Sequence, residues 1–210
     1  MTDASLIKQH EYYNNQFFAK WARLYDIEKY FLFPLRRKAA RFLNLTPPKK
    51  LIDIATGTGS QAYELAKLGH DVIGVDLSPE MLEQAKKKMS SSLRLSFLHT
   101  DATRLPFDDH TFDAASISLG LHDMPYEIDL LVLKEMKRVI KDNGDILIVD
   151  YMEPRKHPVA ALSYPLIRLY ETPNYKKFIK HGLDNVLKKA GLSIYRQTDF
   201  LGFFQIVVTK

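Results

Sequence analysis

The chain has no cysteine among its 210 residues, and this absence removes several kinds of chemistry at once. Without a thiol there is no disulfide bond, no thiolate ligand for zinc and no cysteine nucleophile. Glycine and proline number nine and ten, and neither forms a repeat or a low-complexity tract. The fold must therefore depend on an ordinary hydrophobic core, which 210 residues are enough to bury in one domain.

Long apolar runs are also missing from the chain. No run reaches the roughly 20 residues that a membrane-spanning helix requires. The first residues, Met1 to Ile7, lack the pattern of a secretory signal, so we expect a cytoplasmic protein. A hydrophobic content of 46% with 26% charged residues is typical of a globular domain.

Charge is distributed unevenly along the chain, although the net charge is only +5. Basic and acidic residues number 10 and 4 in residues 1–50, 10 and 17 in residues 51–150, and 10 and 4 in residues 151–210. The acidic middle suits a cationic ligand, and the basic flanks suit an anionic substrate or a lipid headgroup. A solvated surface without a partner explains the same flanks.

The most informative segment is Leu51-Ile-Asp-Ile-Ala-Thr-Gly-Thr-Gly59. Its apolar start predicts a buried strand, and its glycines predict a turn that leads into a helix over residues 60–68. Glycines let a backbone approach a ligand closely, and a helix N-terminus offers free N–H groups. The next predicted strand, residues 71–76, ends in Asp76, where α/β nucleotide-binding folds hold ribose hydroxyls. The pattern indicates a site for a nucleoside cofactor.

The neighbouring residues discriminate between cofactors. Residues 57–62 satisfy the G-x-G-x-x-G/A pattern, so an NAD(P)-dependent oxidoreductase remains open, as does a turn with no ligand. Asp53, however, places a carboxylate beneath the predicted pocket, and Asp101 follows the third predicted strand. A carboxylate repels a pyrophosphate and attracts an ammonium or sulfonium group. No residues typical of hydride transfer follow the motif, so a cationic cofactor is favoured.

Three later segments complete a recognisable series: Gly74-Val-Asp-Leu-Ser-Pro-Glu-Met81, Asp101-Ala-Thr-Arg-Leu-Pro-Phe107 and Asp145-Ile-Leu-Ile-Val-Asp150. With the first segment they resemble the class I S-adenosylmethionine-dependent methyltransferases. The closest likeness is to the small-molecule branch with the ubiquinone/menaquinone C-methyltransferases and the bacterial phospholipid N-methyltransferases. The resemblance covers residues 51–150 well and the flanks loosely. It implies S-adenosylmethionine as cofactor and S-adenosylhomocysteine as its product.

The fold implied by this resemblance is α/β: a Rossmann-like, seven-stranded, mostly parallel sheet with helices on both faces, an antiparallel last strand and an N-terminal helical cap. A single methyltransferase domain would span residues 1–210. Its parts would be the cap (1–49), the cofactor-binding core (50–150), a substrate lid (151–180), and a final helix and hairpin (181–210). Residue patterns predict helices over 31–43, 125–139 and 178–190, the second capped by Asp123, and hairpin strands over 193–200 and 203–209.

The motif positions imply the cofactor-binding residues. In the family the first acidic residue orients the methionine end, the second binds the ribose and the third reads the adenine amino group. The expected set is Asp53, Ala55, Thr56, Gly57, Thr58, Gly59, Asp76, Leu77, Ser78, Met81, Asp101, Ala102, Thr103, Ser118 and Leu119. We also expect Arg36 or Arg37 to reach the methionine carboxylate.

Two residues are candidates for catalysis. His122 lies in the segment after the fourth predicted strand, where the family places substrate-facing residues, and imidazole accepts a proton near neutral pH. A structural histidine is the alternative. The quinone-methylating branch has arginine there, which weighs against a quinone C-methyltransferase. Tyr25 is selected from nine aromatic residues between Tyr12 and Phe33, because a family tyrosine at this position often faces the active site.

The expected acceptor is a small apolar or amphipathic molecule. A phospholipid amine at a membrane surface is the alternative, since the basic flanks and apolar lid suit peripheral membrane contact. Nucleic acid is not expected as a partner, because Ser118-Leu-Gly-Leu121 differs from the Asn/Asp-Pro-Pro-aromatic segment of nucleobase amino-methyltransferases. The absence of cysteine also excludes the thiolate route to pyrimidine methylation. No metal site is predicted, and the oligomeric state is left open.

Overall fold

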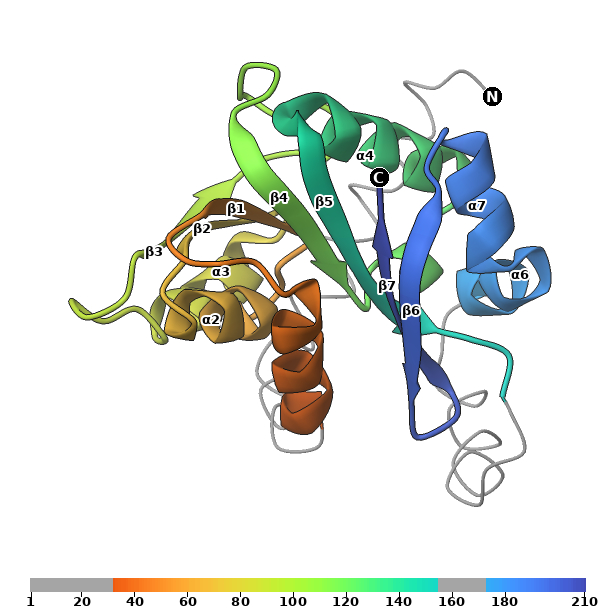
Figure 1. Ribbon diagram of the computed structural model, residues 1–210, viewed down its shortest axis with the longest axis horizontal. Helices are drawn as coiled ribbons and strands as arrows, with labels where there is room; N and C mark the ends of the chain where they lie inside the picture. The colour runs from red at the N-terminus through yellow and green to blue at the C-terminus, as the bar shows by residue number, and fades with distance from the viewer. Residues whose placement is uncertain (1–31, 155–172) are drawn as a thin grey trace.

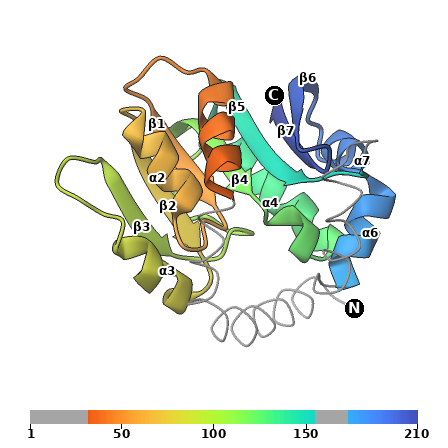
Figure 2. The ribbon, with the colours of Figure 1, turned by 90° about the horizontal axis from the view of Figure 1, so that it is seen from below.

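A computed structural model describes residues 32–154 and 173–210 of the protein. Tyr25, most of the predicted cap and most of the predicted lid therefore lie outside the described residues. The described part is built around one twisted sheet with helices on both of its faces (Figures 1 and 2).

The sheet has seven strands in the order β3-β2-β1-β4-β5-β7-β6. The pairs among β1 to β5 are parallel, whereas β7 runs antiparallel to both of its neighbours, β5 and β6. The prediction of a mostly parallel sheet with an antiparallel last strand is confirmed. The strands are β1 Lys50–Ile54, β2 Asp71–Asp76, β3 Leu95–His99, β4 Phe112–Ser118, β5 Ile140–Tyr151, β6 Ile194–Phe200 and β7 Phe204–Thr209.

Six helical segments accompany the sheet in the described part of the chain, together with a helix over residues 32–43. They are α2 Ser60–Lys67, α3 Pro79–Lys86, the 3₁₀ turn η1 Leu121–Asp123, α4 Tyr126–Val139, α6 Pro173–His181 and α7 Leu183–Lys189. Central strands such as β5 carry unbroken buried apolar runs, because helices cover both sides of the sheet.

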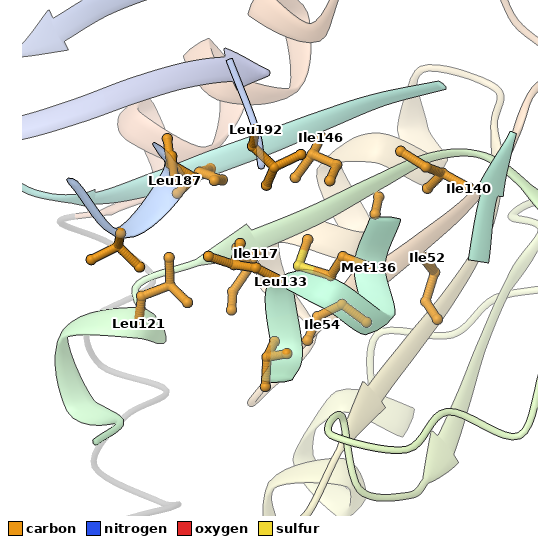
Figure 3. Packing of buried hydrophobic residues seen from close by; sticks show 14 of the residues in the cluster. Ile52, Ile54, Ile117, Leu121, Leu133, Met136, Ile140, Ile146, Leu187 and Leu192 are labelled. Carbon is orange, nitrogen blue, oxygen red and sulfur yellow. The ribbon is translucent and has the colours of Figure 1, made fainter. Parts of the chain in front are cut away.

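Two hydrophobic clusters fill the space between the sheet and its helices. One joins α4 and α7 to the sheet through residues such as Leu133, Met136 and Leu187 (Figure 3). The other joins the helix of residues 32–43 and α2 to the opposite face through residues such as Leu35 and Leu65. This sandwich holds the ends of the central strands rigidly, and the loops at those ends carry the site.

Two local predictions about the helices are wrong. The helix predicted over 178–190 is divided into α6 and α7, because Gly182 adopts a left-handed φ of 74° between them. Asp123 does not cap α4, which begins after Pro125 without any side-chain capping bond. Asp123 instead belongs to η1, the single 3₁₀ turn that connects β4 to α4.

Across residues 32–154 and 173–210, no helix combines the length and the apolar character needed to cross a membrane.

Candidate active site

A pocket opens at the carboxyl ends of β1, β2 and β4, which is where parallel sheets of this kind bind ligands. Among the described residues, the lining of this pocket comes from six segments of the chain, which the sheet brings together. The lining residues are Arg36, Ala55, Thr56, Gly57, Thr58, Ser60, Asp76, Leu77, Met81, Thr100, Asp101, Ala102, Thr103, Ser118, Leu119, Gly120, Asp123, Met124, Ile128 and Val132.

The glycine loop after β1 is fastened to the end of β2. The backbone N–H of Thr56 donates to the carbonyl of Val75 at 2.9 Å, and that of Gly57 donates to Asp76 Oδ2 at 2.7 Å. Gly57 has a φ of 54°, and a Cβ placed on it would meet no atom within 4 Å. The loop therefore leaves open space beside Gly57 in the pocket wall.

Gly59 has a different role from Gly57. Its φ is 76°, and a Cβ placed on it would lie 2.6 Å from Phe97 Cζ and 2.9 Å from Ala85 Cβ. Gly59 is the N-cap of α2 and does not line the pocket. Its missing side chain lets α2 begin close against α3 and β3, so the second glycine of the motif is explained by packing.

Asp76 presents its carboxylate at the pocket from the end of β2. Oδ2 accepts from Gly57 and Oδ1 accepts from the backbone N–H of Ser78 at 2.9 Å. Burial raises the pKa of Asp76, while these backbone donors act in the opposite direction. Each carboxylate oxygen has two lone pairs, so both retain capacity to accept a bond from a ligand hydroxyl. Such a carboxylate suits a ribose diol.

Asp53 lies beneath the loop and does not line the pocket, with only 1% of its surface exposed. Its Oδ2 accepts from Thr56 Oγ1 at 2.6 Å, and its Oδ1 accepts from Ser116 Oγ at 2.5 Å. Desolvation raises the pKa of Asp53 to about 6, against the opposing effects of these hydroxyls and of Arg36. Asp53 thus fixes the loop to β4 and places a buried carboxyl group near the positively charged Arg36.

Asp101 completes the acidic side of the pocket at the end of β3. Its Oδ1 accepts from the backbone N–H of Thr103 at 2.8 Å, and its Oδ2 accepts from Thr103 Oγ1 at 2.7 Å. These two bonds fix the orientation of the carboxylate. Ala102, between them in sequence, contributes an apolar surface to the same wall.

Two non-glycine residues in the pocket wall have left-handed backbones. Ala55 follows β1 with a φ of 47°, and Leu119 follows β4 with a φ of 57°. The N–H of Leu119 donates to the carbonyl of Val149 at 2.7 Å, which holds this conformation. Strained residues of this kind cluster at functional sites, and both here belong to the expected cofactor-binding set.

His122 lies behind the pocket and is not among its lining residues. It is 4% exposed, and its Nδ1 is 2.7 Å from Asp150 Oδ1. Its Nε2 is 3.4 Å from Asp123 Oδ2, and Asp123 does line the pocket. The rings of Tyr151 and Tyr175 pack edge-on against the imidazole.

The structure brings most of the expected cofactor-binding residues together around one pocket. Three members of that set lie outside the lining: Asp53, Gly59 and Ser78. Ser78 caps α3, accepting from the backbone N–H of Met81 at 3.2 Å. Of the two arginine candidates, Arg36 lines the pocket and Arg37 is exposed elsewhere.

Several pocket residues escaped the sequence prediction: Ser60, Thr100, Gly120, Asp123, Met124, Ile128 and Val132. Ile128 and Val132 are one helical turn apart on α4, a spacing that predicts core packing equally well. Met124 and Asp123 lie in the segment expected to face the substrate, and Asp123 was predicted to be a helix cap. The only signal for these residues was their position after β4.

Comparison with known families gives this arrangement an identity. The family described as "Methyltransferase domain" matches residues 51–144, which contain the whole glycine loop, Asp76 and Asp101. This match covers less than half of the chain, and over these residues the chain is similar to that family.

Curated proteins similar to this chain carry methyltransferase names. A demethylmenaquinone methyltransferase of Staphylococcus saprophyticus is 34% identical over 152 residues, covering 71% of this chain and 64% of the relative. One of Clavibacter sepedonicus is 35% identical over 131 residues, covering 62% of this chain and 52% of the relative. The aligned region thus spans between about half and two thirds of each relative.

Solved structures share the fold of this chain. A SAM-dependent methyltransferase from Aquifex aeolicus matches with a TM-score of 0.66 at 21% identity, covering 83% of this chain and 88% of the other. A putative O-methyltransferase from Nostoc punctiforme matches with a TM-score of 0.72 at 19% identity, covering 91% of this chain and 59% of the other.

Proposed function

We propose that the protein transfers a methyl group from S-adenosylmethionine to a small apolar or amphipathic acceptor, namely a reduced quinone of the demethylmenaquinone type. The observation that carries the proposal is the pocket itself. Gly57, Asp76 and Asp101 meet there at one edge of the sheet, within a segment that matches a methyltransferase family. The division into cap, core, lid and final hairpin, and a cytoplasmic location, belong to the same proposal.

The charged residues of the pocket fit the cofactor from end to end. Arg36 supplies a cation for the methionine carboxylate, above the buried carboxyl group of Asp53. Asp76 accepts from the ribose hydroxyls, and Asp101 accepts from the adenine amino group. Leu77, Met81 and Ala102 provide the apolar surface for the adenine ring. All of these residues but Asp53 line the pocket.

The work of the protein in this reaction is positioning and the exclusion of water. S-adenosylmethionine supplies an electrophilic methyl group on a sulfonium, which an acceptor attacks in line with the departing sulfur. Alignment of two bound reactants is worth several kcal/mol of the barrier, up to roughly 7–11 kcal/mol in the best cases. Loops fixed as tightly as the one between Asp53, Thr56 and Asp76 can hold a reactant in such an alignment.

The choice of a quinone acceptor is supported by the two relatives named demethylmenaquinone methyltransferase. Their identity extends over 131 to 152 residues, whereas the opposing argument from His122 concerns one position. An apolar end of the pocket, formed by Met124, Ile128 and Val132, suits a hydrophobic ligand. The family match favours this activity over the NAD(P)-dependent oxidoreductase that the glycine pattern left open.

Methyl transfer from S-adenosylmethionine with a radioactive methyl group tests the proposal. The acceptors are a short-chain 2-prenyl-1,4-naphthohydroquinone kept reduced, phosphatidylethanolamine vesicles and buffer alone. We expect label in the naphthohydroquinone, lost in Asp76→Ala and kept in Asp71→Ala, an exposed carboxylate at the other end of the same strand. Label in the phospholipid would replace the quinone by a lipid amine, and label in neither would reject both acceptors.

A further inference from the structure

The turn after β4 and the end of β5 bring an imidazole between two carboxylates. Leu121-His122-Asp123 forms η1, and Asp150 lies near the end of the adjacent strand. Asp150 Oδ2 accepts from the backbone N–H groups of Leu121 and His122 at 3.0 and 3.3 Å, while Oδ1 contacts His122 Nδ1 at 2.7 Å. This carboxylate, which is buried, therefore fixes both the turn and the imidazole ring.

Of Asp123, His122 and Asp150, only Asp123 lines the pocket. Asp150 is fully buried and the His122 side chain is 5% exposed, whereas the Asp123 side chain is 14% exposed and lines the pocket. The imidazole lies behind it, with Nε2 3.4 Å from Asp123 Oδ2. Catalytic contacts of this kind are often long in structures without a bound substrate. From the pocket inward, the carboxylate of Asp123 is followed by the imidazole of His122 and then by the carboxylate of Asp150.

We propose that Asp123 is the catalytic base that contacts an acceptor hydroxyl, and that the positioning pair His122–Asp150 receives the proton behind it. This inference rests on the proposed function, because it requires an acceptor with an acidic hydroxyl. It differs from the expectation that His122 itself contacts the substrate. The imidazole acts through Asp123.

Carboxylates lie on both sides of the His122 ring. Within residues 32–154 and 173–210, the titratable groups that face the ring are Asp150 and Tyr151 from β5, Asp123 from η1, Asp129 from α4 and Tyr175 from α6. Burial raises the pKa of Asp129 well above its ordinary value, and the charge of Asp150 adds to this effect. Asp123 and Asp150, at 3.4 and 2.7 Å from the two ring nitrogens, are the described carboxylates in contact with the imidazole.

The pKa values of the acceptor hydroxyl, a carboxyl group and an imidazole explain why a carboxylate alone is too weak a base to ionise the acceptor. An aromatic hydroxyl has a pKa of about 10, a carboxyl group about 4 and an imidazole about 6.5. Passing the proton on to the imidazole reduces the difference in pKa between donor and acceptor from about six units to about three and a half. The ring must then hold its own proton on Nδ1, toward Asp150, and present the Nε2 lone pair toward Asp123.

The proton balance of the step is complete. The acceptor O–H bond breaks, its proton moves to an oxygen of Asp123 and then to His122 Nε2, and its electron pair stays with the acceptor. Ionisation of the hydroxyl makes a ring carbon electron-rich, and this carbon forms the bond to the methyl group. The electron pair of the broken carbon–sulfur bond stays on sulfur. Loss of the proton from the methylated ring carbon restores the aromatic ring, and the oxygen recovers a proton. One proton is released overall.

Four variants separate the base from its positioning pair. Asp123→Asn removes the base, and Glu127→Gln is the matched control, because it removes an exposed carboxylate four residues along the chain. His122→Gln places an amide near the position of Nε2, and His122→Asn places one near the position of Nδ1. Neither amide can accept a proton from Asp123. Thermal melting of each variant with S-adenosylmethionine establishes that it folds and binds.

The first readout is methylation of naphthohydroquinones with graded hydroxyl acidity, measured against pH. We expect kcat to fall by about 10²- to 10⁴-fold in Asp123→Asn and in both His122 variants, and to stay unchanged in Glu127→Gln. The deficit should shrink as the acceptor hydroxyl becomes more acidic, since an already ionised acceptor needs no base. An equal deficit for all acceptors, or full activity in Asp123→Asn, would overturn the proposal.

The second readout does not require turnover. Nitrogen-15 NMR of labelled histidine in the wild-type protein should show the proton of His122 on Nδ1. Asp123→Asn should lower the pH at which this ring becomes charged, and Glu127→Gln should not. A proton on Nε2, or no response to Asp123→Asn, would refute the relay even if methylation occurs. A wild-type protein with the expected NMR behaviour and no activity toward any hydroxyl acceptor would instead refute the proposed function, and with it the catalytic role.

Discussion

Gly59→Ala and Gly57→Ala form a matched pair that separates packing from ligand binding in the glycine loop. Both glycines have left-handed backbones, with φ of 76° and 54°, so alanine costs about 1–2 kcal/mol in conformational strain at either position. Only Gly59 adds a collision, at 2.6 Å from Phe97 Cζ and 2.9 Å from Ala85 Cβ. The ring of Phe97 has some freedom to turn, but Ala85 Cβ is fixed to the backbone of α3.

The collision sets the size of the expected difference. Overpacking of this kind costs about 1–3 kcal/mol, which brings Gly59→Ala to roughly 2–5 kcal/mol against about 1–2 kcal/mol for Gly57→Ala. A domain of this length loses about 2–4 °C in Tm for each kcal/mol. We therefore expect Gly59→Ala to melt roughly 2–12 °C below Gly57→Ala, measured by calorimetry without ligand.

Binding should show the reverse order. The methyl group of Gly57→Ala occupies open space in the pocket wall, so we expect its affinity for S-adenosylmethionine to fall about tenfold or more. Folded Gly59→Ala, measured at low temperature, should keep an affinity closer to that of the wild type. Equal melting temperatures for the two variants, or unchanged binding in Gly57→Ala, would refute this division of roles.

Three further predictions concern the carboxylates and the helix cap. Burial raises the pKa of Asp53 from 3.8 to about 6, so this group makes the folded state less stable as the pH rises from about 4 to about 6. Chemical denaturation of the wild-type protein over this pH range should show a loss of at most roughly 3 kcal/mol in the free energy of unfolding, and Asp53→Asn should not show it. The same pH dependence in both proteins would contradict this prediction. Ser78→Ala should cost about 1 kcal/mol through its lost cap on α3 but leave cofactor affinity unchanged, whereas a large loss of affinity would place Ser78 at the ligand. Asp76→Ala should weaken binding of both S-adenosylmethionine and S-adenosylhomocysteine in titration calorimetry, relative to Asp71→Ala, and equal affinities would remove Asp76 from the site.

The core of the fold was predictable because its signals are local. The run Leu51–Ile54, the glycines after it and the helical spacing of residues 60–68 each specify a conformation by short-range chemistry. Their repetition up to Asp150 then implies the parallel sheet. The carboxylates Asp76 and Asp101 were found for the same reason, since each follows a strand and parallel strands end at one edge.

The parts that sequence reasoning missed depend on distant contacts. Nothing near Gly182 distinguishes a helix break from a tolerated glycine, so α6 and α7 were predicted as one helix. The position of His122 after β4 favours a side chain that faces the substrate, with a structural histidine as the alternative. Its burial against Asp150 depends on a strand 28 residues further along the chain. Ile128 and Val132 have the spacing of ordinary core residues, and only the packed structure turns them toward the pocket.

Titration calorimetry with S-adenosylmethionine, S-adenosylhomocysteine and NADH tests the central claim most directly, because it asks which cofactor the pocket accepts before any acceptor is known. We expect saturable binding of one S-adenosylmethionine per chain, comparable binding of S-adenosylhomocysteine, and no heat from NADH. Binding of NADH in place of the other two, or no binding of S-adenosylmethionine by the folded protein, would contradict it.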